Sequence, residues 1–99
     1  MRVLMKVQMD TRITNEALKR GTLQKTMQSA LETIRPEAAY FGTEDGCRTA
    51  YIVFDLEAPF QMPKIAEPFF MELGAKIWYT PVMDREDLGK GLAALMRDG

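Results

Sequence analysis

Two polar side chains, Lys6 and Gln8, interrupt an apolar run near the start of the chain. A lysine that aromatic neighbours remove from water has a lowered pKa and can act as a base, a nucleophile or an anchor for an anion. The same side chain can instead pack its stem on the aromatic rings while its ammonium reaches water or a carboxylate of a partner chain. Both interpretations stay open, and the Gln8 amide needs hydrogen-bond partners once it is covered.

Aromatic residues recur in the other extended runs of the sequence. Tyrosine and tryptophan can line a pocket for a planar apolar ligand, and a phenol can orient a carbonyl or hydroxyl group. Aromatic residues in strands also serve as core or interface, which is the alternative. Tyr79 is a further candidate for the pocket wall. We predict a ligand pocket lined by Lys6, Gln8, Tyr40, Tyr51 and Trp78.

Other chemistry-bearing residues have simpler explanations. Arg48 and Asp55 could be ligand-binding ends of one strand, and the Glu44-Asp45 pair could bind a cation, although a hairpin turn also explains this pair. Cys47 stands beside Arg48, which could lower its thiol pKa, but a lone cysteine at the start of a strand is typically inert. We therefore assign no catalytic residue.

The composition narrows the function classes. The chain has 13 Lys and Arg against 14 Asp and Glu, so no global field would collect nucleic acid or an anionic membrane. It lacks histidine, the usual proton-transfer residue near neutral pH. We find no Gly-rich phosphate loop, zinc spacing, paired-carboxylate motif or nucleophile elbow. We expect no cofactor, no metal site and no nucleic-acid or membrane partner.

The compartment follows from cysteine use and from the first residues. Cys47 is the only cysteine and cannot form an internal disulfide. The start of the chain lacks the long apolar stretch of a signal peptide, and no segment reaches the roughly 18 apolar residues of a membrane helix. We expect a soluble cytoplasmic protein, with residues 1–99 forming one domain.

Hydrophobic periodicity predicts the first half of the fold. Residues 2–9 alternate as a strand. A helix then begins at Thr14 or Asn15, bends at Gly21 and ends before Pro36. Extended runs over 37–43 and 47–56 flank Asp45-Gly46, which favours a tight antiparallel hairpin.

The second half predicts a helix, a strand and a tail helix. Apolar residues at helical spacing cover 62–73; Pro68 should kink this helix or divide it in two, and Gly74 should end it. Residues 75–83 form a fourth strand, which Pro81 places at a sheet edge. A short helix follows the charged stretch 84–87, with Asp87 as a possible cap.

This order predicts an α+β domain of the ferredoxin-like β-α-β-β-α-β type. Right-handed crossovers then give a four-stranded antiparallel sheet with both helices on one face. The other face stays bare, and four strands of six residues cover roughly 400 Å². An apolar patch of that size usually marks an interaction surface.

The chain resembles the dimeric α/β-barrel superfamily, which includes muconolactone isomerase-like proteins, antibiotic-biosynthesis monooxygenase-like proteins and small stress-responsive domains. The resemblance covers residues 1–83 and lies in the segments RVLMKVQM, CRTAYIVFDLE and PFFMELGAKIWYTPVM. It implies a homodimer packed sheet against sheet, and a cavity inside the barrel so formed. No catalytic motif of that superfamily is present to carry over.

Three functions remain in competition. The first possibility is a small-molecule enzyme, such as a cofactor-independent isomerase or oxygenase acting on an apolar or aromatic metabolite. Alternatively it is a non-catalytic module that senses or carries such a metabolite. The third possibility is an assembly domain in which a partner fills the sheet face.

Overall fold

A computed structural model describes all 99 residues, which form four strands and four helices. The elements in chain order are β1 (Arg2–Gln8), α1 (Thr11–Arg20), α2 (Thr22–Ile34), β2 (Ala38–Glu44), β3 (Cys47–Asp55), α3 (Gln61–Leu73), β4 (Lys76–Pro81) and α4 (Arg85–Asp98).

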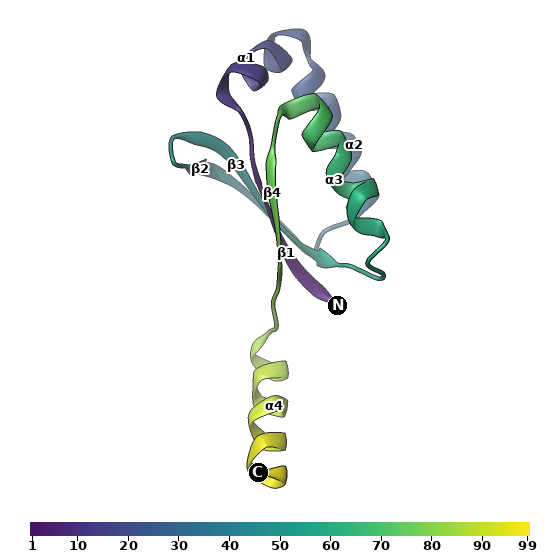
Figure 1. The fold of residues 1–99 in the computed structure, drawn as a ribbon, viewed down its shortest axis with the longest axis vertical. Helices are drawn as coiled ribbons and strands as arrows, with labels where there is room; N and C mark the ends of the chain where they lie inside the picture. The colour runs from purple at the N-terminus through teal and green to yellow at the C-terminus, as the bar shows by residue number, and fades with distance from the viewer.

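The four strands form one antiparallel sheet in the order β2-β3-β1-β4 (Figure 1). β1 and β3 are central, and β2 and β4 are the edges. This α+β arrangement is compatible with the predicted ferredoxin-like layout, and the sheet of the single chain is open rather than a closed barrel. The strand order confirms the predicted edge position of β4, and Pro81 at its end has no N–H for a further strand.

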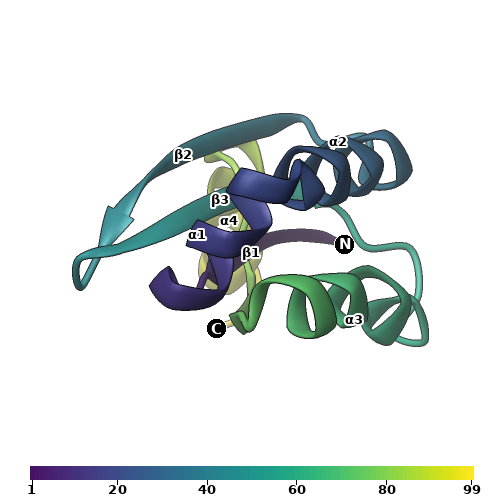
Figure 2. The same ribbon diagram turned by 90° about the horizontal axis from the view of Figure 1, so that it is seen from above.

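The core lies between one face of the sheet and the helices α2 and α3, which cover that face, while α1 lies at the end of β1 and adds Ala17 to the core (Figures 1 and 2). Alternation in β1 buries Val3, Met5 and Val7 while the residues between them remain partly exposed. Phe69 and Leu73 of α3 are fully buried against this layer. The period-two pattern therefore predicted the core face correctly.

The β2–β3 hairpin turns at the residues that the sequence indicated. Asp45 and Gly46 both have positive φ, at 54° and 75°. Two consecutive residues with positive φ match the strand twist of a tight hairpin. The predicted hairpin is confirmed, with β2 ending at Glu44 and β3 beginning at Cys47.

The predicted single helix after β1 is two helices. Gly21 has φ 81° and ends α1, and α2 begins at the next residue. The expectation that Gly21 only bends the helix is therefore wrong. The cap is also earlier than predicted, because the Asp10 side chain accepts a hydrogen bond from the Ile13 amide at 2.9 Å.

Three further expectations need correction. α3 runs unbroken through Pro68, so of the two predicted alternatives, a kink or two pieces, the division into two pieces is wrong. The fourth strand is shorter than predicted, covering Lys76–Pro81. The cap of α4 is Asp84, whose carboxylate accepts from the Asp87 amide at 2.9 Å, while Asp87 occupies the third helical position and completes a capping box.

Gly74 gives a test of the packing between α3 and α1. It has φ 56°, and a Cβ there would lie 2.5 Å from Ile13 Cδ1. We expect Gly74→Ala to lower the free energy of unfolding by about 1–3 kcal/mol, because alanine must adopt a left-handed conformation. Urea denaturation at fixed protein concentration measures the change. Gly42→Ala is the control, since its Cβ meets nothing within 4 Å; equal midpoints for both variants would contradict the prediction.

Candidate functional site

The face of the sheet opposite the helices, here called the open face, carries one row of large side chains across all four strands. Lys6 of β1 lies opposite Tyr51 of β3 and Trp78 of β4. Tyr40 of β2 lies opposite Tyr51 on its other side. Antiparallel partners on one face have neighbouring side chains. Four of the five predicted pocket residues are therefore brought together in a single row.

Lys6 is held by two different interactions within this row. Its ammonium Nζ lies 2.7 Å from Glu44 Oε2, so the ion pair reaches across β3 to β2. The same Nζ lies 4.4 Å from the centroid of the Trp78 ring, within the range of a cation–π contact. The second oxygen of Glu44 accepts a hydrogen bond from the Tyr51 hydroxyl at 3.2 Å. Glu44 thus joins Lys6 to Tyr51.

Gln8, the fifth predicted residue, extends the network toward the hairpin. Its amide Nε2 donates to the Glu44 backbone carbonyl at 3.2 Å and lies 3.4 Å from Asp45 Oδ2. Gln8 therefore ties the end of β1 to the hairpin turn. It neighbours the row rather than belonging to it.

The network fixes the charge state of its members. The hydrogen bond to Glu44 raises the pKa of Lys6, against the effect of desolvation. The hydrogen bond from Lys6 lowers the pKa of Glu44. Desolvation, followed by the hydrogen bond to Glu44, raises the pKa of Tyr51. Near neutral pH the site holds an ammonium, a carboxylate and a protonated phenol, with no net charge.

This charge state argues against one interpretation of Lys6 in the single chain. A desolvated lysine with a lowered pKa would be a base or a nucleophile, whereas the pKa of Lys6 is raised. The alternative, a stem on aromatic rings with the ammonium on a carboxylate, describes the observed contacts. The carboxylate comes from the same chain rather than from a partner.

Glu44 is the residue that the sequence interpretation missed as a member of this site. Its place before Asp45-Gly46 suggested a turn residue or, with Asp45, a ligand for a cation. A signal was nevertheless present, because Glu44 follows Tyr40 by four positions in a strand, and even spacing sends both side chains to the same face.

Several residues singled out in the sequence do not join the row and its Lys6–Glu44 network on the open face. Tyr79 points to the helix side, where its hydroxyl donates to the Met62 carbonyl at 3.0 Å, and burial raises its pKa to about 12. The Arg48 guanidinium donates to Thr14 Oγ1 of α1 at 2.7 Å. Asp55 lies at the far end of β3 and pairs with the amino terminus. Tyr79 is therefore not a wall of the predicted pocket.

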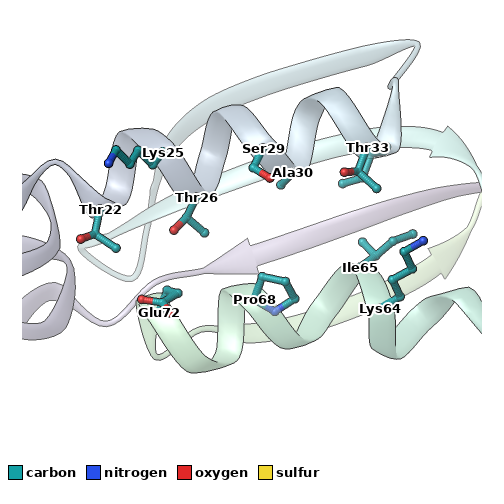
Figure 3. A pocket seen from close by; sticks show the side chains of 11 residues that line it. Thr22, Lys25, Thr26, Ser29, Ala30, Thr33, Lys64, Ile65, Pro68 and Glu72 are labelled. Atoms are coloured by element: carbon teal, nitrogen blue, oxygen red, sulfur yellow. The ribbon is translucent and has the colours of Figure 1, made fainter.

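The hollows of the single chain lie away from the open-face row. The largest, of about 510 Å³, is a groove between α2 and α3 (Figure 3). Hydroxyl side chains line its α2 wall, and Lys25 and Lys64 lie toward opposite ends. A second groove, of about 340 Å³, lies by Met27 and Phe41. None of the four hollows is lined by Tyr40, Tyr51 or Trp78. Charged groups converge on the open face and not in the larger groove.

Comparison with models of known protein families and with curated proteins finds no match to this chain. No three or more Cys, Asp or Glu side chains come together in a metal-binding arrangement. None of the helices combines the length and the apolar character needed to cross a membrane.

The Lys6–Glu44 pair predicts a measurable titration. Because its pKa is lowered in the folded state, Glu44 contributes stability that is fully present above its ordinary pKa of 4.5 and is lost as pH falls through the folded-state pKa. We expect Lys6→Met to raise the Glu44 pKa toward that ordinary value, as followed by carboxyl-carbon NMR.

The matched control is Lys90→Met, which removes an ammonium 3.4 Å from Glu86 on α4. It should leave the Glu44 titration unchanged. Identical Glu44 pKa values in the wild type and in Lys6→Met would show that the pair is not formed in solution.

Proposed function

We propose that the open face pairs with the same face of a second copy and that the pair encloses a small-molecule site around Lys6, Glu44, Tyr51 and Trp78. The observation that carries this proposal is the connected row of polar and aromatic side chains in the middle of a face that no helix covers. The superfamily resemblance supports the same arrangement, a dimeric α/β barrel.

The exposure of the aromatic residues supports the need for a partner. Trp78 is 44% exposed and Tyr40 is 70% exposed in the single chain. Leu4 and Val53 share this face and lie opposite each other one step along the sheet. Contiguous apolar surface of this kind on a folded protein marks an interaction site.

The chemistry of the row indicates the class of ligand. Lys6 and Glu44 neutralise each other, so the site favours an uncharged molecule over an anion. Trp78 and the tyrosines offer flat apolar surfaces. The Tyr51 hydroxyl already donates its proton to Glu44, and its oxygen can accept a hydrogen bond from a ligand hydroxyl. An apolar or aromatic metabolite with one hydroxyl group fits. In an enzyme of the cofactor-independent isomerase or oxygenase type, Tyr51 would orient that hydroxyl.

A second candidate function is an assembly module without a ligand. The observation in its favour is that every polar group of the Lys6–Glu44–Tyr51 network already has a partner within the chain. A partner sheet could then pack directly on the row and leave no cavity. The two candidates share the dimer and differ in whether space remains inside it.

Trp78→Glu tests the dimer. The substitution places an unpaired carboxylate in a surface that the proposal makes dry, and burying such a charge is costly. We expect light scattering at micromolar concentration to give twice the chain mass of 11.3 kDa for the wild type and the chain mass for the variant. A wild type that scatters as a single chain would refute the proposal.

Two further variants keep this test interpretable. Tyr40→Glu should also dissociate the dimer, and its side chain is exposed enough in the single chain for the variant to fold. Phe60→Glu is the control, because Phe60 is 80% exposed in the turn before α3 and lies off the open face. It should remain a dimer.

Ligand binding is tested with 2-naphthol, a planar aromatic alcohol, against naphthalene. We expect saturable amide shifts in NMR spectra at Lys6, Tyr51 and Trp78 with 2-naphthol. We expect Tyr51→Phe to weaken binding about 2- to 10-fold, the range of one neutral hydrogen bond. A dimer that shows no shifts up to the solubility limit of the probe would favour the assembly module.

A further inference from the structure

The helix α4 lies outside the body of the protein. It follows β4 and extends beyond the end of the sheet (Figure 1). None of its residues is buried. The radius of gyration is 16.1 Å and the longest extent is 56 Å, whereas a compact chain of this length has a radius of about 13 Å.

One side of α4 is apolar, although nothing covers it. The apolar residues recur at i, i+4, i+7 and i+8, which places them in one stripe. Their exposed fractions range from 50% at Leu88 to 82% at Met96. The stripe consists of Leu88, Leu92, Leu95 and Met96. Such a stripe in a globular protein faces a core.

An unpacked helix of this length is marginal in water. Isolated helices shorter than about 12–15 residues have little helical content even in favourable sequences. α4 has 14 residues and contains Gly89 and Gly91, each of which costs about 1 kcal/mol relative to alanine. Its capping box offsets only part of this cost. The helix therefore needs a packing partner to be stable.

The first turn of α4 is tied to the open-face side of the sheet. Arg2 shares the face of Lys6, and its Nη1 lies 3.3 Å from Asp84 Oδ2 and 3.5 Å from Asp87 Oδ2. Its Nε also pairs with Glu37 at 2.5 Å. The hydrogen bond from the Asp87 backbone, followed by the charge of Arg2, lowers the pKa of Asp84. α4 thus starts beside the surface proposed to pair with a second copy.

We propose that α4 is an arm that packs its apolar stripe on a second copy of this chain. The inference rests on the pairing of open faces proposed above. Stable interfaces bury about 800 Å² on each partner. The sheet face supplies roughly 400 Å², so it needs an additional contact, and the stripe of α4 continues the same interface.

Charge argues for a protein surface rather than a lipid surface as the occupant. Helices that lie on anionic membranes carry an excess of lysine and arginine on their polar face. α4 has three basic residues, Arg85, Lys90 and Arg97, and three acidic residues, Glu86, Asp87 and Asp98. This balance gives no attraction to an anionic membrane.

Hydrogen exchange on the full chain, combined with sedimentation, tests the arm. The test variant is Leu92→Glu. The matched control is Ala94→Glu, which adds the same charge on the side of α4 away from the stripe, since its neighbours one turn away are Lys90, Gly91, Arg97 and Asp98. We expect protected α4 amides in the wild-type dimer and in the control. In Leu92→Glu we expect loss of that protection and at least a 10-fold higher dimer dissociation constant.

The possible outcomes separate this inference from the proposed function. A dimer that Trp78→Glu dissociates but Leu92→Glu does not would overturn the arm and leave the sheet pairing intact. Protected α4 amides in a monomeric wild type would mean that α4 folds back on its own chain, and would overturn both. Wild-type α4 amides that exchange like those of a free peptide in a dimer would also overturn the arm.

Discussion

The sheet of this protein has two large faces, and its helices cover only one of them. Alternation along β1 sends Val3, Met5 and Val7 to the helices, so the same geometry must send Lys6 and its neighbours to the opposite side. Because side chains alternate strictly, the chain cannot bury one set without exposing the other. The position of Trp78, the reach of Lys6 toward Glu44 and the proposed need for a second copy all follow from this constraint.

The ion pair on the open face is exposed to water in the single chain, and its hydrogen bonds reduce the cost of burying it under a partner. Burying a salt bridge costs free energy unless further hydrogen bonds satisfy its remaining groups. Here the Tyr51 hydroxyl donates to the second oxygen of Glu44, and the Trp78 ring lies against the Lys6 ammonium. A network already satisfied within one chain loses little when a partner displaces its water. The same holds for a small uncharged ligand, which would also displace water from a network whose polar groups are already paired.

The sequence predicted the sheet better than the helices, for physical reasons. Period-two alternation identifies a face directly, and Asp45-Gly46 specifies its hairpin through backbone angles that few residues adopt. The break at Gly21 was not predicted because the apolar spacing resumes at Leu23. Hydrophobic periodicity alone does not detect a helix interruption of one residue. Glu44 was missed as a site residue because the composition around it is typical of a turn. Its even spacing from Tyr40, which places both side chains on one face, was therefore not used. The stripe of α4 was visible, but spacing within one helix does not say what the helix packs on.

The central claim is that the open face is covered by another copy of the same chain. Trp78 is the only tryptophan and lies on that face, on the edge strand β4 opposite Lys6. Acrylamide quenching of its fluorescence at several protein concentrations therefore tests the claim directly. The account predicts weak quenching at micromolar concentration and stronger quenching on dilution, as the dimer dissociates. Strong quenching that is the same at every concentration would contradict it.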